Sequence, residues 1–378
     1  MARSRWPLVA IVALVVTLSS CGARTVASPG PEPAVLHVQG NRILDRFQRP
    51  VQFHGVNRSG TEYACIQGFG IFDGPSDAAS VAAMAAWHIN IVRIPLNEDC
   101  WLGINGVKRQ FSRARYVKAI VTYVNLLHAH GIYAELSLIW GAPGTAKADY
   151  QPDAPDEDHS PAMWAGMARA FKHDPNVILA PWGETTVTEQ CFVDGCRDQA
   201  SYGTGPWDGD TSCGKGCFHY TVAGMAQAVR VMRGAGYTGI IAIPGVDFAN
   251  DLSGWLKYEP PDPRHQLIAE AHVYQKQICS TVKCFGAEYA PVAARVPLLW
   301  GETGEVDCGS RWIDSAVPWA AAHTVGYEAW TWDKWGTCAS LIKNYGGAPA
   351  NRFGRWIKSF YANFAAPVDL IRPRSNVA

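Results

Sequence analysis

The chain has few charged residues for its length. Only 17% of its 378 residues are Asp, Glu, Lys or Arg, and the formal net charge is zero. No cluster of Lys or Arg stands out along the sequence, so the basic patch that nucleic-acid binding requires is lacking and we expect no nucleic-acid partner. Because 48% of the residues are hydrophobic, disordered, collagen-like and coiled-coil classes are also excluded.

The apolar run at the N-terminus is too short to cross a bilayer comfortably. Arg3 and Arg5 precede this run, which covers residues 8–18 and is typical of a secretory signal peptide. It ends in Leu-Ser-Ser-Cys at 18–21, which resembles the bacterial lipoprotein cleavage box. That resemblance implies that Cys21 becomes the lipid-modified first residue of the mature protein. The alternative is an ordinary signal peptide with an incidental cysteine, and both interpretations predict an extracytoplasmic protein.

These features divide the chain into three parts. We predict a signal peptide over 1–20, a lipidated cysteine and a flexible tether over 21–33, and a single folded domain over 34–378. The tether is assigned because its Pro-, Ser- and Ala-rich sequence lacks the residues of a packed core. On this interpretation the membrane is a partner through the lipid anchor, and we expect the protein to be a monomer.

Several catalytic motifs are missing from the sequence. It contains no G-x-S-x-G and no His-Glu-x-x-His, which argues against α/β-hydrolases with a serine nucleophile and against zinc peptidases. The dinucleotide fingerprint G-x-G-x-x-G occurs at 234–239. It follows a predicted helix and precedes a predicted strand, which is the reverse of the order that directs a helix N-terminus at a pyrophosphate.

Cysteines are plentiful and agree with export. Apart from Cys21 there are ten, an even number in an oxidising compartment. Their spacing favours five disulfides, namely Cys65–Cys100, Cys191–Cys196, Cys213–Cys217, Cys279–Cys284 and Cys308–Cys338. The alternative is zinc, since the short spacings approach those of metal ligands. Export and the lack of companion His pairs favour disulfides.

From residue 35 onward, short β-rich runs alternate with amphipathic helical segments. A hairpin over 35–39 and 43–45 is expected to cap the bottom of a barrel. Each later run is nearly all apolar, as expected of parallel strands buried on both faces. The predicted strands are 52–56, 89–94, 133–138, 177–182, 239–243, 267–271, 298–301 and 327–330, and the predicted helices include 76–87, 113–130, 161–173, 220–234, 313–323 and 352–364. Eight such units predict a (β/α)8 TIM barrel of the α/β class.

Polar residues collect at the predicted C-terminal ends of these strands, where barrels of this type carry their active sites. Glu184 follows the fourth strand and Glu302 follows the seventh. Arg93 lies at the end of the second strand, His272 and Tyr274 at the end of the sixth, and Trp330 at the end of the eighth. Glycoside hydrolysis needs this combination of a carboxylic acid, a carboxylate and an aromatic surface for the sugar ring. The strand ends therefore favour a glycosidase.

The chain also resembles glycoside hydrolase family 5, the cellulase-like family, over nearly the whole mature length. The resemblance rests on Phe-His-Gly-Val-Asn-Arg-Ser-Gly at 53–60, Val-Arg-Ile-Pro-Leu-Asn-Glu-Asp-Cys-Trp at 92–101 and Trp-Thr-Trp at 330–332. It implies Glu184 as acid/base and Glu302 as nucleophile, and it implies no metal and no organic cofactor. The implied substrate-binding residues are Arg93, His272, Tyr274 and Trp330, to which we add Trp140 and Trp182 at the ends of the third and fourth strands.

Two positions depart from the family pattern. The family places Asn immediately before the acid/base Glu, where this chain has Gly183, and His where this chain has Ile139. The missing Asn would bond the 2-hydroxyl of the sugar, a contact that strengthens in the transition state. Either the sugar at the cleavage point presents a different 2-position, or the protein binds sugar without cleaving it.

We therefore expect an extracytoplasmic, lipid-anchored retaining glycoside hydrolase that cleaves a β-linked oligo- or polysaccharide. The alternative is a non-catalytic carbohydrate-binding lipoprotein on the same barrel. The residues that favour the enzyme are the intact Arg93, Glu184, His272, Tyr274 and Glu302. Gly183 and Ile139 favour the binding protein.

The cleavage box makes a prediction about location. Cys21→Ala should release the protein from membranes, because lipid anchoring at this position depends on the thiol and stable anchoring needs more than one acyl chain. Membrane fractionation of cells that produce the two forms measures this. A variant that still sediments with membranes through an uncleaved N-terminus would contradict the lipoprotein interpretation.

Overall fold

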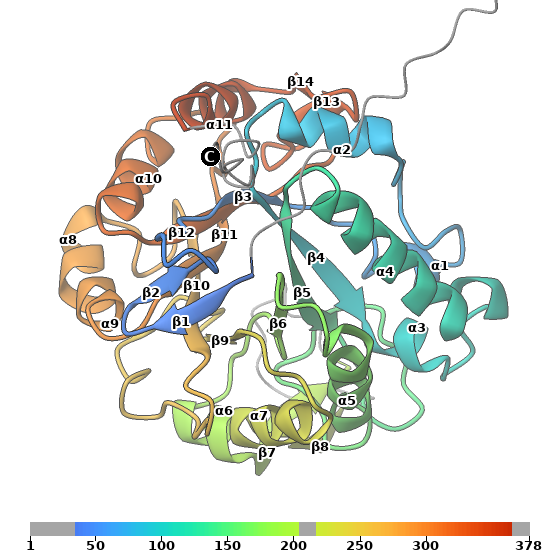
Figure 1. Ribbon diagram of the computed structural model, residues 1–378. Coiled ribbons are helices and arrows are strands. Elements are labelled where there is room, and N and C mark those ends of the chain that lie inside the picture. The colour runs from blue at the N-terminus through green and yellow to red at the C-terminus, as the bar shows by residue number, and fades with distance from the viewer. Residues whose placement is uncertain (1–34, 204–216, 365–378) are drawn as a thin grey trace, which may run out of the picture.

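A computed structural model describes residues 35–203 and 217–364. Eight parallel strands close into a barrel whose order follows the chain (Figure 1). They are β3 (His54–Asn57), β4 (Ile91–Asn97), β5 (Tyr133–Trp140), β6 (Val177–Ala180), β9 (Ile241–Pro244), β10 (Leu267–Tyr274), β11 (Leu298–Gly304) and β12 (Gly326–Ala329). The predicted (β/α)8 TIM barrel is confirmed, and each predicted strand overlaps an observed one.

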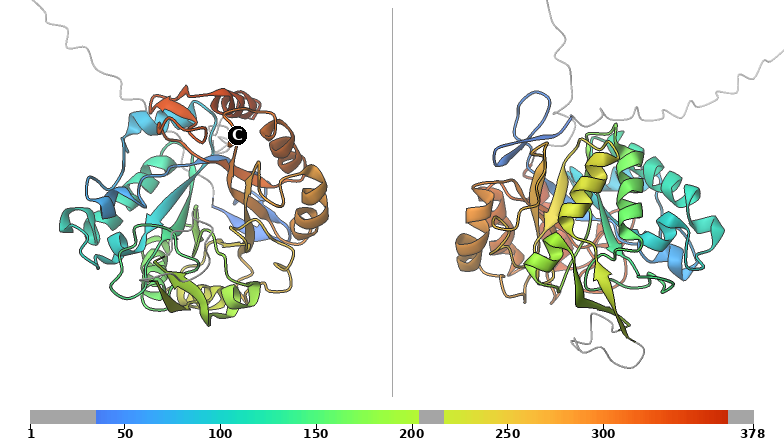
Figure 2. Two further views of the ribbon diagram at one scale, coloured as in Figure 1. Left: turned by 180° about the vertical axis from the view of Figure 1, so that it is seen from behind. Right: turned by 90° about the horizontal axis from the view of Figure 1, so that it is seen from below.

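Helices form a ring around the barrel, as the two further views in Figure 2 also show. The longer ones are α2 (Ala78–Ala85), α4 (Ala114–His128), α5 (Ser160–Phe171), α7 (Met225–Gly234), α10 (Ile313–Ala322) and α11 (Arg352–Tyr361). The short ones are α1 (Ala64–Gln67), α3 (Glu98–Leu102), η1 (Arg109–Phe111), α6 (Glu189–Asp194), α8 (Val282–Cys284), η2 (Phe285–Tyr289) and α9 (Ala290–Ala293). In α4, residues 116, 120, 123, 124 and 127 are buried, because their spacing of three and four puts them on the face toward the sheet.

The N-terminal end of the barrel is filled with apolar side chains. Ile91, Tyr133, Ile178 and Leu299 belong to one cluster there. The hairpin of β1 (His37–Gln39) and β2 (Arg42–Leu44) adds Ile43 to the same cluster, which confirms the predicted cap. Because this end is sealed, the polar residues of the strands gather at the opposite end.

One predicted helix begins too early. The sequence predicted a helix over 220–234, but β8 (Phe218–Val222) precedes α7 and pairs antiparallel with β7 (Cys196–Tyr202). In β8, Tyr220 and Val222 are buried while Thr221 between them is exposed, which is the alternation of a strand rather than of a helix. A second small hairpin, β13 (Ile342–Asn344) with β14 (Ala348–Pro349), was not predicted either.

Four of the five predicted disulfides are present: Cys65–Cys100, Cys191–Cys196, Cys279–Cys284 and Cys308–Cys338. For the fifth, Cys213–Cys217, Cys217 is disulfide-bonded, whereas Cys213 lies outside the described residues. Within residues 35–203 and 217–364, no helix has the length and hydrophobicity needed to span a membrane.

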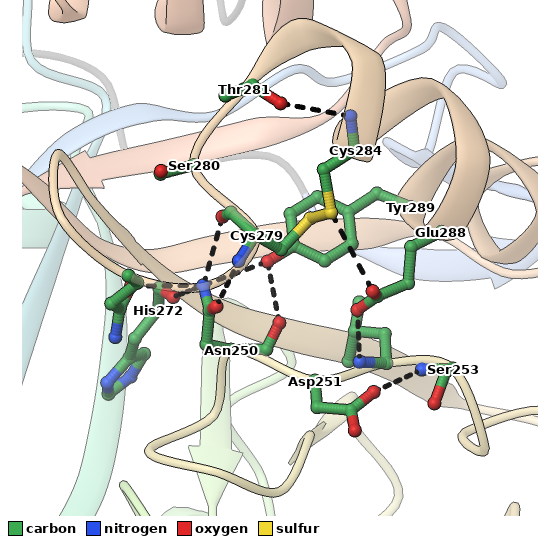
Figure 3. Close-up of a disulfide and its surroundings, with 12 residues drawn as sticks. Asn250, Asp251, Ser253, His272, Cys279, Ser280, Thr281, Cys284, Glu288 and Tyr289 are labelled. Atoms are coloured by element: carbon green, nitrogen blue, oxygen red, sulfur yellow. Dashed lines mark hydrogen bonds between the residues drawn. A yellow bond between two sulfur atoms is a disulfide. The ribbon is translucent and has the colours of Figure 1, made fainter.

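The Cys279–Cys284 disulfide supports a loop beside the C-terminal end of β10 (Figure 3). The Asn250 amide donates to the carbonyl oxygens of His272, at 3.0 Å, and of Cys279, at 3.2 Å. The Cys279 N–H in turn donates to the Asn250 side chain at 2.8 Å. The disulfide loop is thereby tied to the backbone of His272.

The disulfides should differ in their effect on stability. Cys65–Cys100 joins residues 35 apart and Cys279–Cys284 joins residues 5 apart. Loop-closure entropy then predicts a loss of about 4 kcal/mol in the free energy of unfolding for Cys65→Ala/Cys100→Ala, against about 2 kcal/mol for Cys279→Ala/Cys284→Ala. Urea unfolding of the two double variants measures the difference. Equal losses would contradict this account.

Candidate active site

Glu302 reaches the site because β11 bulges. In the pairing of β10 with β11, Ala271 lies opposite Trp300 and His272 opposite Glu302, so Gly301 is skipped. Such a bulge re-aims the side chains that follow it. The Glu302 carboxylate accepts one hydrogen bond from Arg93 Nη1 at 2.6 Å and another from the Tyr274 hydroxyl at 2.7 Å.

The surroundings of Glu302 keep it ionised. Burial alone would raise the pKa of this carboxyl, but the positive charges of His272 and Arg93 and the Tyr274 hydrogen bond outweigh burial and lower it. An ionised carboxylate held by two donors on fixed strands can act as a nucleophile at neutral pH.

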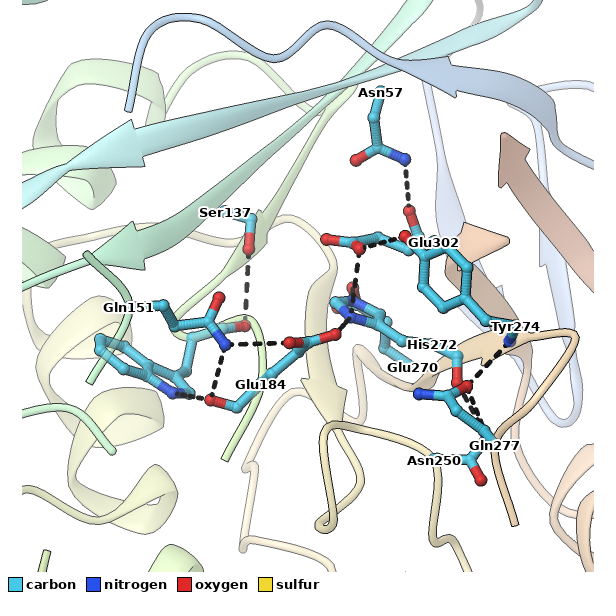
Figure 4. A network of polar contacts seen from close by, with 12 residues as sticks. Asn57, Ser137, Gln151, Glu184, Asn250, Glu270, His272, Tyr274, Gln277 and Glu302 are labelled. Atoms are coloured by element: carbon cyan, nitrogen blue, oxygen red, sulfur yellow. Dashed lines mark hydrogen bonds and ion pairs between the residues drawn. The ribbon is translucent and has the colours of Figure 1, made fainter. Parts of the chain in front are cut away.

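Glu184 follows β6 and faces Glu302 across the mouth of the barrel (Figure 4). Its Oε1 accepts a hydrogen bond from His272 Nδ1 at 2.8 Å, and its Oε2 accepts one from Gln151 Nε2 at 3.1 Å. The same His272 nitrogen lies 3.6 Å from Glu302 Oε2. Contact atoms of the two glutamates and His272 all lie within 4.8 Å of one another. The structure therefore brings the two predicted carboxylates together.

His272 is a cation at neutral pH. Burial would lower its pKa, but the charge on Glu302 and the hydrogen bonds to Glu184 and Glu270 raise it to about 10. The imidazolium presents Nδ1–H to Glu184 and Nε2–H to Glu270, whose Oε1 lies 3.3 Å from Nε2. Arg93 Nη2 lies at the same distance, 3.3 Å, from Nε2.

Arg93, from β4, is buried at the centre of this network. Its Nε contacts Glu135 Oε1 at 3.1 Å, its Nη1 contacts Asn57 Oδ1 at 2.9 Å, and its Nη2 contacts Ser137 Oγ at 3.0 Å. Because Nε, Nη1 and Nη2 are all hydrogen-bonded, the guanidinium is held in its orientation toward Glu302. Sequence reasoning missed Asn57 and Ser137 as support residues, although Asn57 stands at the end of a predicted strand.

Gln151 was also missed, and nothing in the sequence pointed to it. It lies in the long loop between β5 and α5, thirty-three residues before Glu184. A Gln in a loop has no recognisable pattern, and only the folded chain brings it to the carboxylate.

The aromatic candidates divide into two groups. Trp140 and Trp330 are half-buried at the ends of β5 and β12 and can offer surface to a ligand. Tyr63 lies beside Trp140, with ring centroids 6.3 Å apart, and Trp335 lies 6.2 Å from Trp330. Trp335 is 41% exposed, so these four rings form a partly open aromatic surface at the mouth.

Trp182 is a correction to the sequence interpretation. Its side chain is fully buried, so it has no face on which a sugar could stack. Its indole N–H donates to the Glu184 backbone oxygen at 2.5 Å. Trp182 packs beneath the site and fixes the backbone that carries Glu184.

The two atypical positions touch each other. A Cβ atom at Gly183 would lie 3.1 Å from Ile139 Cδ1 and 3.5 Å from Arg93 Nη2. Ile139 is buried. The isoleucine therefore crowds the space that a side chain at position 183 would need, and the two departures form one local change beside the carboxylates.

Three groups of side chains in the described part of the chain could be considered as metal ligands. His272 with Glu184 and Glu302 is one, and there His272 Nδ1 already donates to Glu184 Oε1 at 2.8 Å. Cys279 and Cys284 with Glu288 is another, and its two sulfur atoms are joined in a disulfide. Glu98 with Asp156 and His159 is the third. There, burial and the neighbouring Asp156 raise the pKa of Glu98 well above its usual range, and the two carboxyls hydrogen-bond to each other. A shared proton satisfies this pair.

The fold and the facing glutamates define a barrel protein of the glycosidase type. The sequence model of the cellulase family, glycosyl hydrolase family 5, matches residues 44–336 of the chain. The chain belongs to glycoside hydrolase family 5.

Solved structures of other proteins share the fold. A β-glucanase from Saccharophagus degradans has 17% sequence identity, a TM-score of 0.63, and coverage of 89% of this chain and 95% of its own; it has also been solved with cellotetraose. A β-mannanase from Streptomyces thermolilacinus, solved with mannohexaose, has 18% identity, a TM-score of 0.60, and coverage of 90% and 100%. No curated protein sequence matches the chain.

Proposed function

We propose that this protein is a retaining glycoside hydrolase that acts on a β-linked oligo- or polysaccharide. The observation that carries the proposal is the short separation of Glu184 and Glu302, whose oxygens approach within 4.8 Å. Retaining enzymes hold their two carboxyl groups about 5–5.5 Å apart, whereas inverting enzymes need about 6.5–9.5 Å to admit a water molecule. An approach of one oxygen of each carboxylate to within 4.8 Å supports the shorter, retaining separation.

The two glutamates take different roles in this mechanism. Glu302, kept ionised by Arg93 and His272, attacks the anomeric carbon and forms a glycosyl ester. Glu184 gives a proton to the leaving oxygen and then takes one from the water that hydrolyses the ester. Tyr274 and Arg93 hold Glu302 in line for attack.

The aromatic surface supports a carbohydrate as the substrate. Trp140, Trp330, Tyr63 and Trp335 offer flat apolar faces at the mouth, and such faces suit the C–H-rich sides of sugar rings. The ligands of the similar structures, cellotetraose and mannohexaose, are oligosaccharides, which favours a chain-like substrate here.

We also propose that the enzyme works outside the cytoplasm on a lipid anchor at Cys21. The four disulfides among the described residues support this location, because such bonds persist in oxidising compartments. A short tether before the barrel would keep the enzyme close to the membrane.

A sugar-binding protein without turnover is the second candidate. It is favoured by one observation: Ile139 and Gly183 place an apolar wall beside the carboxylates, where the family has two polar side chains. Loss of a transition-state contact there would slow hydrolysis by about tenfold for each 1.4 kcal/mol.

Substitution of the proposed nucleophile, Glu302, tests the mechanism. Glu302→Gln should lower kcat by about four orders of magnitude or more while sugar binding is nearly retained, because the nucleophile is lost and the shape is kept. Reducing-end assays on a panel of cell-wall and plant glycans, with calorimetry for binding, measure both quantities.

Azide distinguishes the two roles. With Glu184→Ala, azide should restore cleavage of an activated aryl glycoside and give the β-glycosyl azide, since the ester on Glu302 still forms. With the matched Glu302→Ala variant, azide should attack directly and give the α-glycosyl azide. Reversed products would contradict the assignment, and binding of several sugars with no cleavage of any would favour the second candidate.

The contact between Ile139 and Gly183 makes a further prediction. Gly183→Asn with Ile139→His should raise kcat/KM on β-glucans by about tenfold or more, because it adds a hydrogen bond to the sugar 2-hydroxyl. Gly183→Asn alone should gain much less, because the new side chain meets Ile139. Kinetics of the single and double variants form a double-mutant cycle. If the effects of the two single substitutions on kcat/KM add up to that of the double variant, the claim that the side chains at 139 and 183 compete for one space would be contradicted.

A further inference from the structure

Glu270 lies behind the catalytic residues and was not among the predicted site residues. It is on β10, two residues before His272, and is fully buried. Its Oε1 lies 3.3 Å from His272 Nε2 and 3.5 Å from Arg93 Nε. One carboxylate oxygen thus contacts both cations of the site, on the side away from Glu184 and Glu302.

The space for Glu270 is provided by Gly301. A Cβ atom at position 301 would lie 2.0 Å from Glu270 Oε1, so no other residue fits there while Glu270 stays in place. Gly301 is also the residue that the register of β10 and β11 skips, directly before Glu302. The bulge therefore both aims Glu302 at the mouth and admits Glu270 beneath it.

The backbone around His272 is also fixed from outside the barrel. The His272 N–H donates to the Ala249 carbonyl at 2.9 Å, and Asp247, Phe248 and Ala249 all have positive φ, between 50° and 58°. Non-glycine residues adopt this conformation only when the surrounding structure imposes it. The ring of His272 is thus set from both sides, by this turn at its backbone and by Glu270 at Nε2.

We propose that Glu270 is a positioning residue that keeps the His272 ring doubly protonated, with its Nδ1–H directed at Glu184; this rests on the proposed function of Glu184 as acid/base. A neutral imidazole carries one N–H and cannot donate to carboxylates on both of its nitrogens. With Glu270 accepting at Nε2, the second proton is retained at Nδ1. Glu270 thereby acts on Glu184 through His272 without contacting substrate.

Several titratable groups surround Glu270, and the positioning of His272 is assigned to Glu270 rather than to one of them. These groups are Arg93 on β4, Glu135 on β5, His272 and Tyr274 on β10, Glu302 on β11 and Glu328 on β12, with Glu184 beyond the end of β6. Burial raises the pKa of Glu135 and Glu328 well above the usual range. Among the described residues, Glu270 hydrogen-bonds to His272, whereas Glu135 and Glu328 do not.

Glu328 offers a matched control. It is as deeply buried as Glu270, on β12, yet neither of its oxygens has a hydrogen-bond partner among the residues that the structure describes. Glu328→Gln removes a titratable group from the same cluster without touching the His272 contact. An effect of Glu270→Gln that Glu328→Gln lacks is therefore due to the contact and not to repacking.

The experiment is an NMR titration of the His272 ring in ¹⁵N-histidine-labelled protein, with the signal assigned by its loss in His272→Asn. In the wild type the ring should titrate near pH 10. In Glu270→Gln the midpoint should fall by about one pH unit or more, since an opposite charge and a hydrogen bond to the cation are lost. In Glu328→Gln it should stay within about 0.3 units of the wild type.

An unchanged midpoint in Glu270→Gln, or an equal fall in Glu328→Gln, would overturn the proposal. Glu270→Asp provides a second measurement if Glu270→Gln does not fold, because it keeps the charge but withdraws it from Nε2; its midpoint should fall in the same direction by less, and no fall would again overturn the proposal. The titration needs no turnover. If no glycan is cleaved but the midpoints move as expected, the proposed hydrolase function fails and the positioning role stands.

Discussion

The buried charge of Arg93 is the constraint on which the rest of the site depends. A guanidinium cannot lose its proton, so a fully buried one must be surrounded by acceptors. Asn57, Ser137, Glu135 and Glu302 supply them from three strands, β3, β5 and β11. The same charge lowers the pKa of Glu302, which a buried carboxylate needs if it is to attack at neutral pH. Removing the cation would leave buried acids that protonate.

The barrel separates apolar packing from polar chemistry along its axis. Side chains such as Ile91, Ile178 and Leu299 fill the N-terminal end under the β1–β2 hairpin. The ionisable residues lie a few residues further along the same strands, as Arg93 does after Ile91 and Glu302 after Leu299. Strand positions set the directions of these side chains within narrow limits, whereas the loops that add Gln151 and the aromatic rings are free to vary. Disulfides compensate by fixing loops such as the one tied to Asn250.

Much of the site could be predicted because strand ends are recognisable in a sequence. Glu184, Arg93, His272 and Glu302 each follow or end a short apolar run, and the closed barrel brings such ends together. Trp182 was misassigned for the same reason. A residue at a strand end points either into the mouth or into the layer behind it, and local sequence does not tell which.

The sequence by itself determined the eight-stranded barrel, the four described disulfides and the residues at its mouth, because strand periodicity and cysteine spacing are local properties. Only the tertiary structure decided how those residues act on one another. The skipped Gly301, the contact of Ile139 with Gly183 and the ionisation of His272 all depend on atoms from strands far apart in the chain. Electrostatic energies depend on the distances between charges and on their burial, and neither quantity can be read from the order of the residues in the chain.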